Sequence, residues 1–219
     1  SSFSASASGK YTDRPTITYT PMTGNAFIKT LMTPLNPSQI LFSIQSGAPA
    51  DLIFKLGVSS INGMRNEQMT TGDYIPVEAK FLRVIELMKE LQKAGAISFK
   101  IVKHKDGQDV SYISFLSRAG DTVVSGQAGE LCELLGLDRS VRQYRVVYGI
   151  VPENNREIAM QTASVMRIMT FMAARADVPE KDVAEKRATP GIREAMGSAG
   201  RDSRFVIKCS NWEWEPKDA

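Results

Sequence analysis

The stretch that decides the fold runs from residue 76 to residue 115 and reads PVEAKFLRVIELMKELQKAGAISFKIVKHKDGQDVSYISF. Apolar residues recur at helical spacing in its first half, which predicts an amphipathic helix from Pro76 to Gly95. The residues of that apolar stripe are Val77, Phe81, Val84, Ile85, Met88 and Leu91. In the second half, two strand-like runs over 97–103 and 110–115 flank Asp106-Gly107, which predicts an antiparallel hairpin. A helix followed by a hairpin indicates the α+β class.

Towards the C-terminus, the pattern predicts further helices and strands of the same kind. We expect a short helix over Gln127–Leu135 that stops at Gly136, and a strand over Tyr144–Val151. A second long amphipathic helix is predicted over Arg156–Ala174, and a final strand over Phe205–Cys209. The buried stripe expected for this second long helix is Ile158, Val165, Met169 and Met172. Because a strand comes so close to the last residue, we expect the folded unit to continue past residue 219.

Towards the N-terminus, the signals favour short helices. Thr16–Tyr19 is predicted to be a strand, and Thr23 is predicted to cap a helix that ends near Pro34. The apolar face of this helix is Phe27, Ile28, Leu31 and Met32. A second helix begins at a capping box formed by Asn36, Pro37 and Gln39, and ends at Gly47. The stretch 52–61 fits both a strand and a helix, and its alternation slightly favours a strand.

The polar stretch 62–73 is the best candidate for a boundary between two modules, because it contains Asn62-Gly63 and Thr71-Gly72. We therefore expect an N-terminal strand plus helical module over 1–66 and an α+β module over 74–219. The expected architecture is two small helix–sheet modules with antiparallel hairpins and two long amphipathic helices.

The composition excludes several classes of protein. Of the 219 residues, 42% are hydrophobic and 23% are charged, values that indicate a globular chain with a core. The net charge of +3 is too small to imply a polyanionic partner, and no apolar run reaches the ~20 residues of a membrane span. Two cysteines and one histidine exclude a Cys/His zinc site of ordinary spacing, so we expect no metal and no cofactor.

Catalytic machinery is not apparent either. The single histidine, His104, is predicted to lie at the tip of the hairpin, far from a nucleophile. No Gly-x-Ser-x-Gly or phosphate-loop motif is present, and the glycines at 191, 197 and 200 do not follow a strand. The pairs Glu130/Glu133 and Glu153/Glu157 are typical of solvated faces and helix N-termini. We therefore predict no catalytic residue, and a cell-envelope hydrolase with an unconventional acid pair stays an alternative.

A second alternative is a DNA-binding module. The helix over 76–94 followed by the hairpin resembles half of a winged-helix domain, in which Lys103, His104 and Lys105 would contact phosphates. The polar face of the helix mixes acids and bases evenly and carries no cluster that reads base edges. We therefore favour a protein without a nucleic-acid partner.

The two ends of the chain carry the candidate contact residues. Phe3 and Tyr11 lie in a stretch whose alternation is typical of an edge strand or a flexible lead, and such an edge can accept a strand from a partner. Trp212 and Trp214 suit either a contact surface or packing against further sequence. Cys132 and Cys209 are either two buried thiols or a disulfide formed in an oxidising compartment.

Two stretches resemble a family of Gram-negative bacterial envelope lipoproteins to which no activity has been assigned. The first is GKYTDRPTITYTPMTG at 9–24, which continues through Leu31-Met-Thr-Pro34, Gln45-Ser-Gly47 and Ser60-Ile-Asn-Gly63. The second is Tyr144-Arg-Val-Val-Tyr-Gly149, followed by REIAMQT at 156–162 and Val178-Pro179. The resemblance covers most of positions 9–180.

The resemblance implies a location and a mode of action. It implies a periplasmic protein, anchored to the outer membrane through a lipid that lies outside this chain. We expect a non-enzymatic structural or assembly component that binds envelope proteins or copies of itself. A periplasmic location also argues against contact with DNA, and it makes a Cys132–Cys209 disulfide chemically possible.

Overall fold

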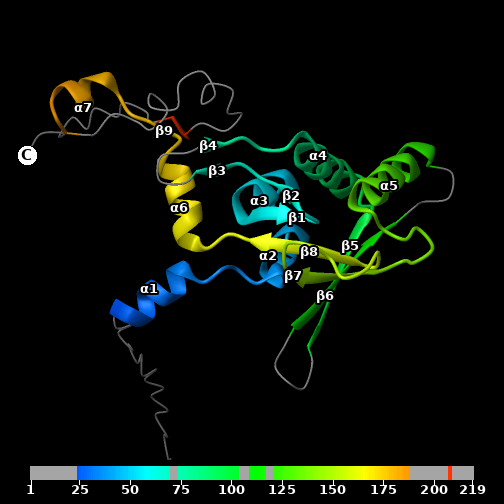
Figure 1. The fold of residues 1–219 in the computed structure, drawn as a ribbon. Coiled ribbons are helices and arrows are strands. Elements are labelled where there is room, and N and C mark those ends of the chain that lie inside the picture. The colour runs from blue at the N-terminus through cyan, green and yellow to red at the C-terminus, as the bar shows by residue number, and fades with distance from the viewer. Residues whose placement is uncertain (1–23, 70–73, 104–108, 117–120, 188–206, 209–219) are drawn as a thin grey trace, which may run out of the picture.

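The computed structural model describes residues 24–69, 74–103, 109–116, 121–187 and 207–208, and these form a mixed α+β fold, as the sequence predicts (Figure 1). The described helices are α1 (Gly24–Met32), α2 (Pro37–Gln45), α3 (Ala50–Gly57), α4 (Ala79–Lys93), α5 (Thr122–Leu135), α6 (Val165–Ala173) and α7 (Glu180–Ala184). The described strands are β1 (Val58–Ile61), β2 (Met64–Arg65), β3 (Gln68–Met69), β4 (Tyr74–Ile75), β5 (Ile97–Lys103), β6 (Asp109–Phe115), β7 (Tyr144–Tyr148), β8 (Glu157–Thr162), β9 (Ala176–Asp177) and β10 (Ile207–Lys208).

A six-stranded sheet forms the centre of the protein, in the order β2-β1-β8-β7-β6-β5. Neighbouring strands are antiparallel except β7 and β8, which are parallel. The connection between β7 and β8 is the short segment 149–156, which contains no helix. Two smaller two-stranded sheets pair β3 with β4 and β9 with β10.

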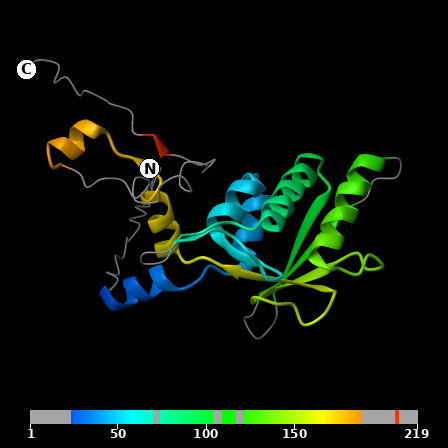
Figure 2. The same cartoon turned by 45° about the horizontal axis from the view of Figure 1, so that its top comes forward.

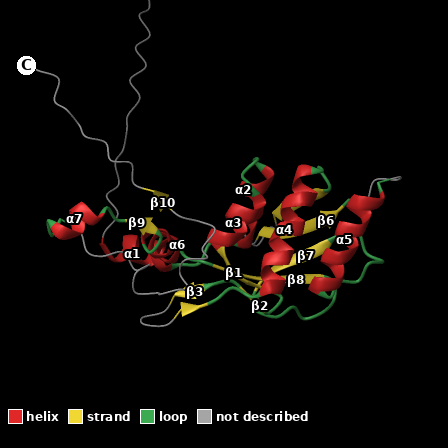
Figure 3. Ribbon diagram, turned by 90° about the horizontal axis from the view of Figure 1, so that it is seen from above, coloured by secondary structure: helices red, strands yellow, loops and turns green. Residues whose placement is uncertain are grey.

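Helices α2, α3, α4 and α5 lie side by side along one face of the six-stranded sheet (Figures 2 and 3). The core lies between this helical layer and the sheet, and its largest fully buried side chains come from both layers. They include Leu41, Phe54, Phe81, Leu87, Leu91, Leu131, Ile113, Ile158 and Met160. Helices α1, α6 and α7 lie apart from this layer (Figure 3). Among the described residues, no helix is long and apolar enough to cross a membrane.

The strongest local signals in the sequence are confirmed. Helix α2 begins with the expected capping box, in which Asn36 Oδ1 accepts from the backbone of Ser38 and Gln39 Oε1 accepts from the backbone of Asn36. Helix α4 begins at Ala79, later than predicted, and buries the predicted stripe except Val77, which precedes the helix and is half-buried. β5 pairs with β6 in continuous register from Ile97↔Phe115 to Lys103↔Asp109. Helix α5 ends at Gly136, whose φ of 66° is the left-handed conformation that favours glycine.

Two secondary-structure predictions are wrong. The stretch 52–61, for which we favoured a strand, is divided between helix α3 and strand β1. The long helix predicted over 156–174 is strand β8 followed by the shorter helix α6, and the switch occurs where the Ser164 side chain caps α6. In both stretches, apolar residues continue from one element into the next. A strand and a helix repeat with different periods, so one periodicity applied to the whole stretch predicts the wrong element. Helix α5 also begins earlier than predicted, and strand β7 ends at Tyr148 rather than at residue 151.

Residues from both sides of the expected boundary at 62–73 share the main sheet, because β1 pairs with β8. The division into modules 1–66 and 74–219 stays a prediction. The strand predicted over Thr16–Tyr19 lies outside the described residues. Of the strand predicted over 205–209, the described part is β10, which pairs in parallel with β9.

Candidate interaction surface

Most contact residues predicted at the chain ends lie outside the described residues, namely Phe3, Tyr11, Cys209, Trp212 and Trp214. Cys132 is described, and it is a buried free thiol. Its Sγ lies 3.6 Å from the hydroxyl of Tyr144. The Cys132 thiol thus lies in the core on α5, which agrees with the first of the two alternatives given for this residue, a buried thiol.

One carboxylate of each glutamate pair considered above lies beside an arginine. Glu130 accepts from Arg83 Nε at 2.7 Å, and this guanidinium holds the pKa of the Glu130 carboxyl below its usual range. Glu157 lies 3.5 Å from Arg145. His104 and the rest of the hairpin tip lie outside the described residues. Among the residues that the structure describes, no three His, Cys, Asp or Glu side chains group as a metal site.

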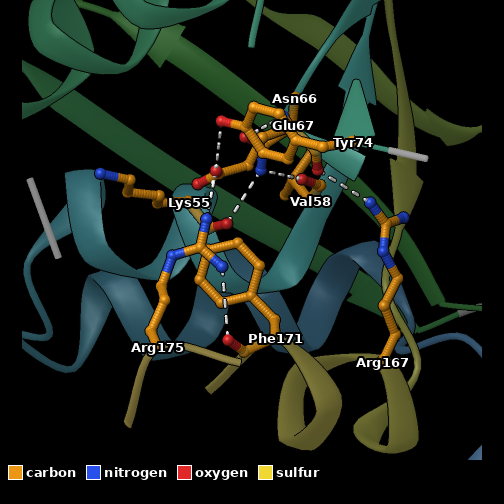
Figure 4. A network of polar contacts seen from close by, with 8 residues as sticks. All are labelled: Lys55, Val58, Asn66, Glu67, Tyr74, Arg167, Phe171 and Arg175. Carbon is orange, nitrogen blue, oxygen red and sulfur yellow. Dashed lines mark hydrogen bonds and ion pairs between the residues drawn. The ribbon is translucent and has the colours of Figure 1, made fainter. Parts of the chain in front are cut away.

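A buried ion pair between Glu67 and Arg175 is the most unusual polar feature of the described structure (Figure 4). The side chains of Glu67 and Arg175 are only 7% and 4% exposed. The hydroxyl of Tyr74 also donates to Glu67 Oε2, at 3.3 Å. The Arg175 guanidinium lies over the ring of Phe171, 3.5 Å from its centroid, and donates to the Phe171 carbonyl oxygen. Burial lowers the pKa of Arg175, which shows that the charged form loses solvation here, and the Glu67 carboxylate opposes that effect.

A second arginine of the same segment reaches the same network. Arg167 donates to the hydroxyl of Ser59 on β1 and to the backbone carbonyl of Glu67. Asn66, next to Glu67, donates to the carbonyl oxygens of Lys55 and Val58 at 2.8 and 2.7 Å (Figure 4). The network thus joins three parts of the chain that are far apart in sequence: the α3–β1 junction, the β2–β3 region and helix α6.

The network fixes the rotation of α6 about its own axis. Arg167, Phe171 and Arg175 follow one another at intervals of four residues, so they lie on one side of α6 and its C-terminal end. That side faces the ion pair and β1, as Figure 4 shows for these labelled residues. The methionines of α6 therefore lie on the other side, where Met169 is 56% exposed and Met166 is 41% exposed.

Helix α1 is a second helix with exposed apolar side chains. It contacts α6, and none of its residues is buried. Its predicted apolar face is therefore present but does not enter the core: Phe27 is 50%, Ile28 52% and Met32 63% exposed. We define the α1–α6 surface as the exposed apolar side chains of these two helices, Phe27, Ile28, Met32, Met166, Met169 and Met172.

Sequence reasoning missed this surface for an identifiable reason. The periodicity of the sequence predicts Met169 and Met172 on the core side of a single long helix over 156–174. Breaking that helix at Ala163-Ser164 changes which residues share a face, and the signal for the break was the serine in an N-cap position. Glu67 and Arg175 gave no signal of their own, because each stands in a polar stretch that reads as a loop.

Comparison of the chain with protein-family models, with curated proteins and with solved structures finds no match. Function is therefore inferred from the site itself and from the resemblance given above.

Proposed function

We propose that this protein is a non-enzymatic assembly component that binds other proteins through the α1–α6 surface. The observation that carries the proposal is the cluster of exposed large apolar side chains on two adjacent helices of which neither buries a residue. Contiguous apolar surface on a folded protein typically marks an interaction site. Methionine suits such a surface, because its flexible side chain adapts to different partner shapes.

The buried network supports the same proposal. A protein that binds through a helix needs that helix held in one orientation, because orienting it on binding would cost conformational entropy. Arg167 and Arg175 hold α6 against β1 and Glu67. The described part of the surface carries few charges, since α1 has Lys29 alone and Arg167 points into the network. Two copies of such a surface can therefore approach each other with little like-charge repulsion.

The proposed compartment is the periplasm, with attachment to the outer membrane through a lipid outside this chain. This part of the proposal is supported by the resemblance of positions 9–180 to envelope lipoproteins. The proposed partner is a protein of the envelope, and a second copy of this chain is the first partner to test.

The test compares one change inside the α1–α6 surface with one outside it. Met169→Glu places a charge in the centre of the surface, and Val123→Glu is the matched control, because Val123 is an exposed apolar residue on α5. The wild type and the control are expected to associate in sedimentation velocity and to crosslink to protein in intact cells. Met169→Glu should lose both. Recovery of the wild type as an uncrosslinked monomer in both assays would contradict the proposal.

A further inference from the structure

The six-stranded sheet ends in two edges of different kinds, β2 on one side and β5 on the other. β2 is two residues long, and the carbonyl oxygen of Arg65 accepts a hydrogen bond from the backbone of Glu78. β5 is seven residues long, contains no proline and pairs with β6 over its whole length without a bulge. Shortness, bulges and prolines are the usual protections of a sheet edge. Of the two edges, β5 is therefore the one that suits the addition of a further strand.

One hydrogen bond shows which backbone groups of β5 point outward. The amide of Leu116 donates to the carbonyl oxygen of Ala96 at 2.7 Å, in line with the register of β5 and β6. In an antiparallel ladder, residues that bond to the neighbouring strand alternate with residues whose N–H and C=O point the other way. Counting from Ala96, the even-numbered residues of β5 bond to β6. The residues whose backbone points outward are Ile97, Phe99 and Ile101.

These outward groups have no partner in the part of the chain that the structure describes. No hydrogen bond there joins the N–H or C=O of Ile97, Phe99 or Ile101 to another residue. Each of the three residues therefore offers one donor and one acceptor to an added strand. Main-chain hydrogen bonds of this kind provide the affinity when an extended peptide joins a sheet edge.

The side chains of the same residues specify what such a strand must carry. Ile97 and Phe99 are half-buried and pack against the core. Residues directly opposite each other on paired strands project to the same face of the sheet. An added strand with an apolar residue at every second position would therefore cover the exposed parts of Ile97 and Phe99.

The other face of β5 adds a requirement for charge. Ser98 and Lys100 project to this face and are exposed. Lys100 lies opposite Tyr112 on β6, it forms no ion pair in the described part of the chain, and β5 contains no acidic residue. An acidic residue directly opposite Lys100 would form a favourable cross-strand pair.

Lys100 also makes a second copy of β5 a poor occupant of this edge. In an antiparallel pair of two β5 strands centred on Phe99, Lys100 or Ile101, the two Lys100 side chains are direct or diagonal neighbours. Like charges at such positions repel each other. The charge at this edge thus favours an acidic strand from another protein over self-pairing.

We propose that the outer edge of β5 binds an extended segment of another protein in which apolar and acidic residues alternate. The backbone of the segment pairs with Ile97, Phe99 and Ile101, its apolar side chains cover Ile97 and Phe99, and an acidic side chain pairs with Lys100. This edge shares no residue with the α1–α6 surface, and the inference does not depend on that surface.

The experiment adds two peptides to the whole chain and follows amide hydrogen exchange by NMR. The peptides are acetyl-Thr-Val-Glu-Val-Glu-Val-Thr-amide and the same sequence with lysine in place of each glutamate. We expect a saturating amount of the glutamate peptide to slow exchange at Ile97, Phe99 and Ile101 at least about tenfold. The lysine peptide should bind roughly three- to tenfold more weakly. Unchanged exchange at these amides, or equal binding of the two peptides, would overturn the proposal.

Two variants connect the binding to the β5 edge. Lys100→Glu should reverse the preference between the two peptides, whereas Lys80→Glu, at an exposed lysine of α4, is the matched control and should not. Ile101→Pro removes one outward N–H but no hydrogen bond to β6, and it should abolish the slowing at Ile97 and Phe99. An unchanged preference in Lys100→Glu would overturn the proposal. So would slow exchange at these amides that increases with protein concentration in the absence of peptide, because the occupant would then be a second copy.

Discussion

Replacing Glu67 with glutamine is the most direct test of the role assigned to the buried network. The change keeps the size and shape of the side chain, but it removes the negative charge that faces Arg175. The Arg175 guanidinium then loses the carboxylate that it pairs with, and it keeps its contacts with the Phe171 carbonyl oxygen and the Phe171 ring. Removing one partner of a buried ion pair is strongly destabilising.

The expected loss is large compared with the stability of a typical domain. Both side chains are more than 90% buried, so solvent screens their interaction only weakly. Breaking a buried pair by removing one partner costs about 3–5 kcal/mol. For a chain of 219 residues, this corresponds to a fall in Tm of roughly 6–20 °C. Because the network positions α6, the variant should also weaken association through the α1–α6 surface.

The assay is urea denaturation of Glu67→Gln, with Glu78→Gln as the matched control. Glu78 pairs with Arg65 at 2.8 Å, but these side chains are 37% and 56% exposed, so the control should change the free energy of unfolding little. The double variant Glu67→Gln/Arg175→Met removes both charges and should recover much of the loss, because methionine packs well against an aromatic ring. A loss below about 1 kcal/mol for Glu67→Gln, or no recovery in the double variant, would refute this account.

Three further predictions test other parts of the fold by urea denaturation. Gln92→Ala should lower the free energy of unfolding by about 2 kcal/mol. The Gln92 side chain accepts from the Ala50 backbone and donates to two carbonyl oxygens near the end of α2. An unchanged free energy of unfolding would contradict that role. Gly136→Ala should destabilise the protein by about 1–2 kcal/mol, because φ is positive at this residue. Gly126→Ala should stabilise it, because Gly126 lies inside α5 and alanine favours a helix more than glycine does. Equal effects of the two variants would contradict this explanation. Burial raises the pKa of Tyr144, so the hydroxyl ionises more readily in the unfolded chain than in the folded protein. Tyr144 therefore contributes fully to the free energy of unfolding below about pH 10, and this contribution is lost as the pH rises further. Tyr144→Phe should therefore lose less stability between pH 9 and pH 11 than the wild type, and identical profiles would contradict the assignment.

The sequence predicts the α1–α6 surface only in part. The apolar face of α1 was predicted from Phe27, Ile28, Leu31 and Met32, but its exposure was not, because periodicity shows that residues share a face and not what covers it.

Elements with local signals follow from the amino-acid sequence alone. The helix α4, the β5–β6 hairpin, the capping box at Asn36 and the stop at Gly136 each depend on residues a few positions apart, so short-range chemistry specifies them.

Three features could be read only from the folded chain: the pairing of β1 with β8, the contact of Glu67 with Arg175 and the exposure of α1 and α6. Each of these depends on residues about a hundred positions apart, or on which apolar faces find a partner when the chain collapses. Whether an apolar face is buried depends on all the other apolar faces of the chain, so no single segment predicts it.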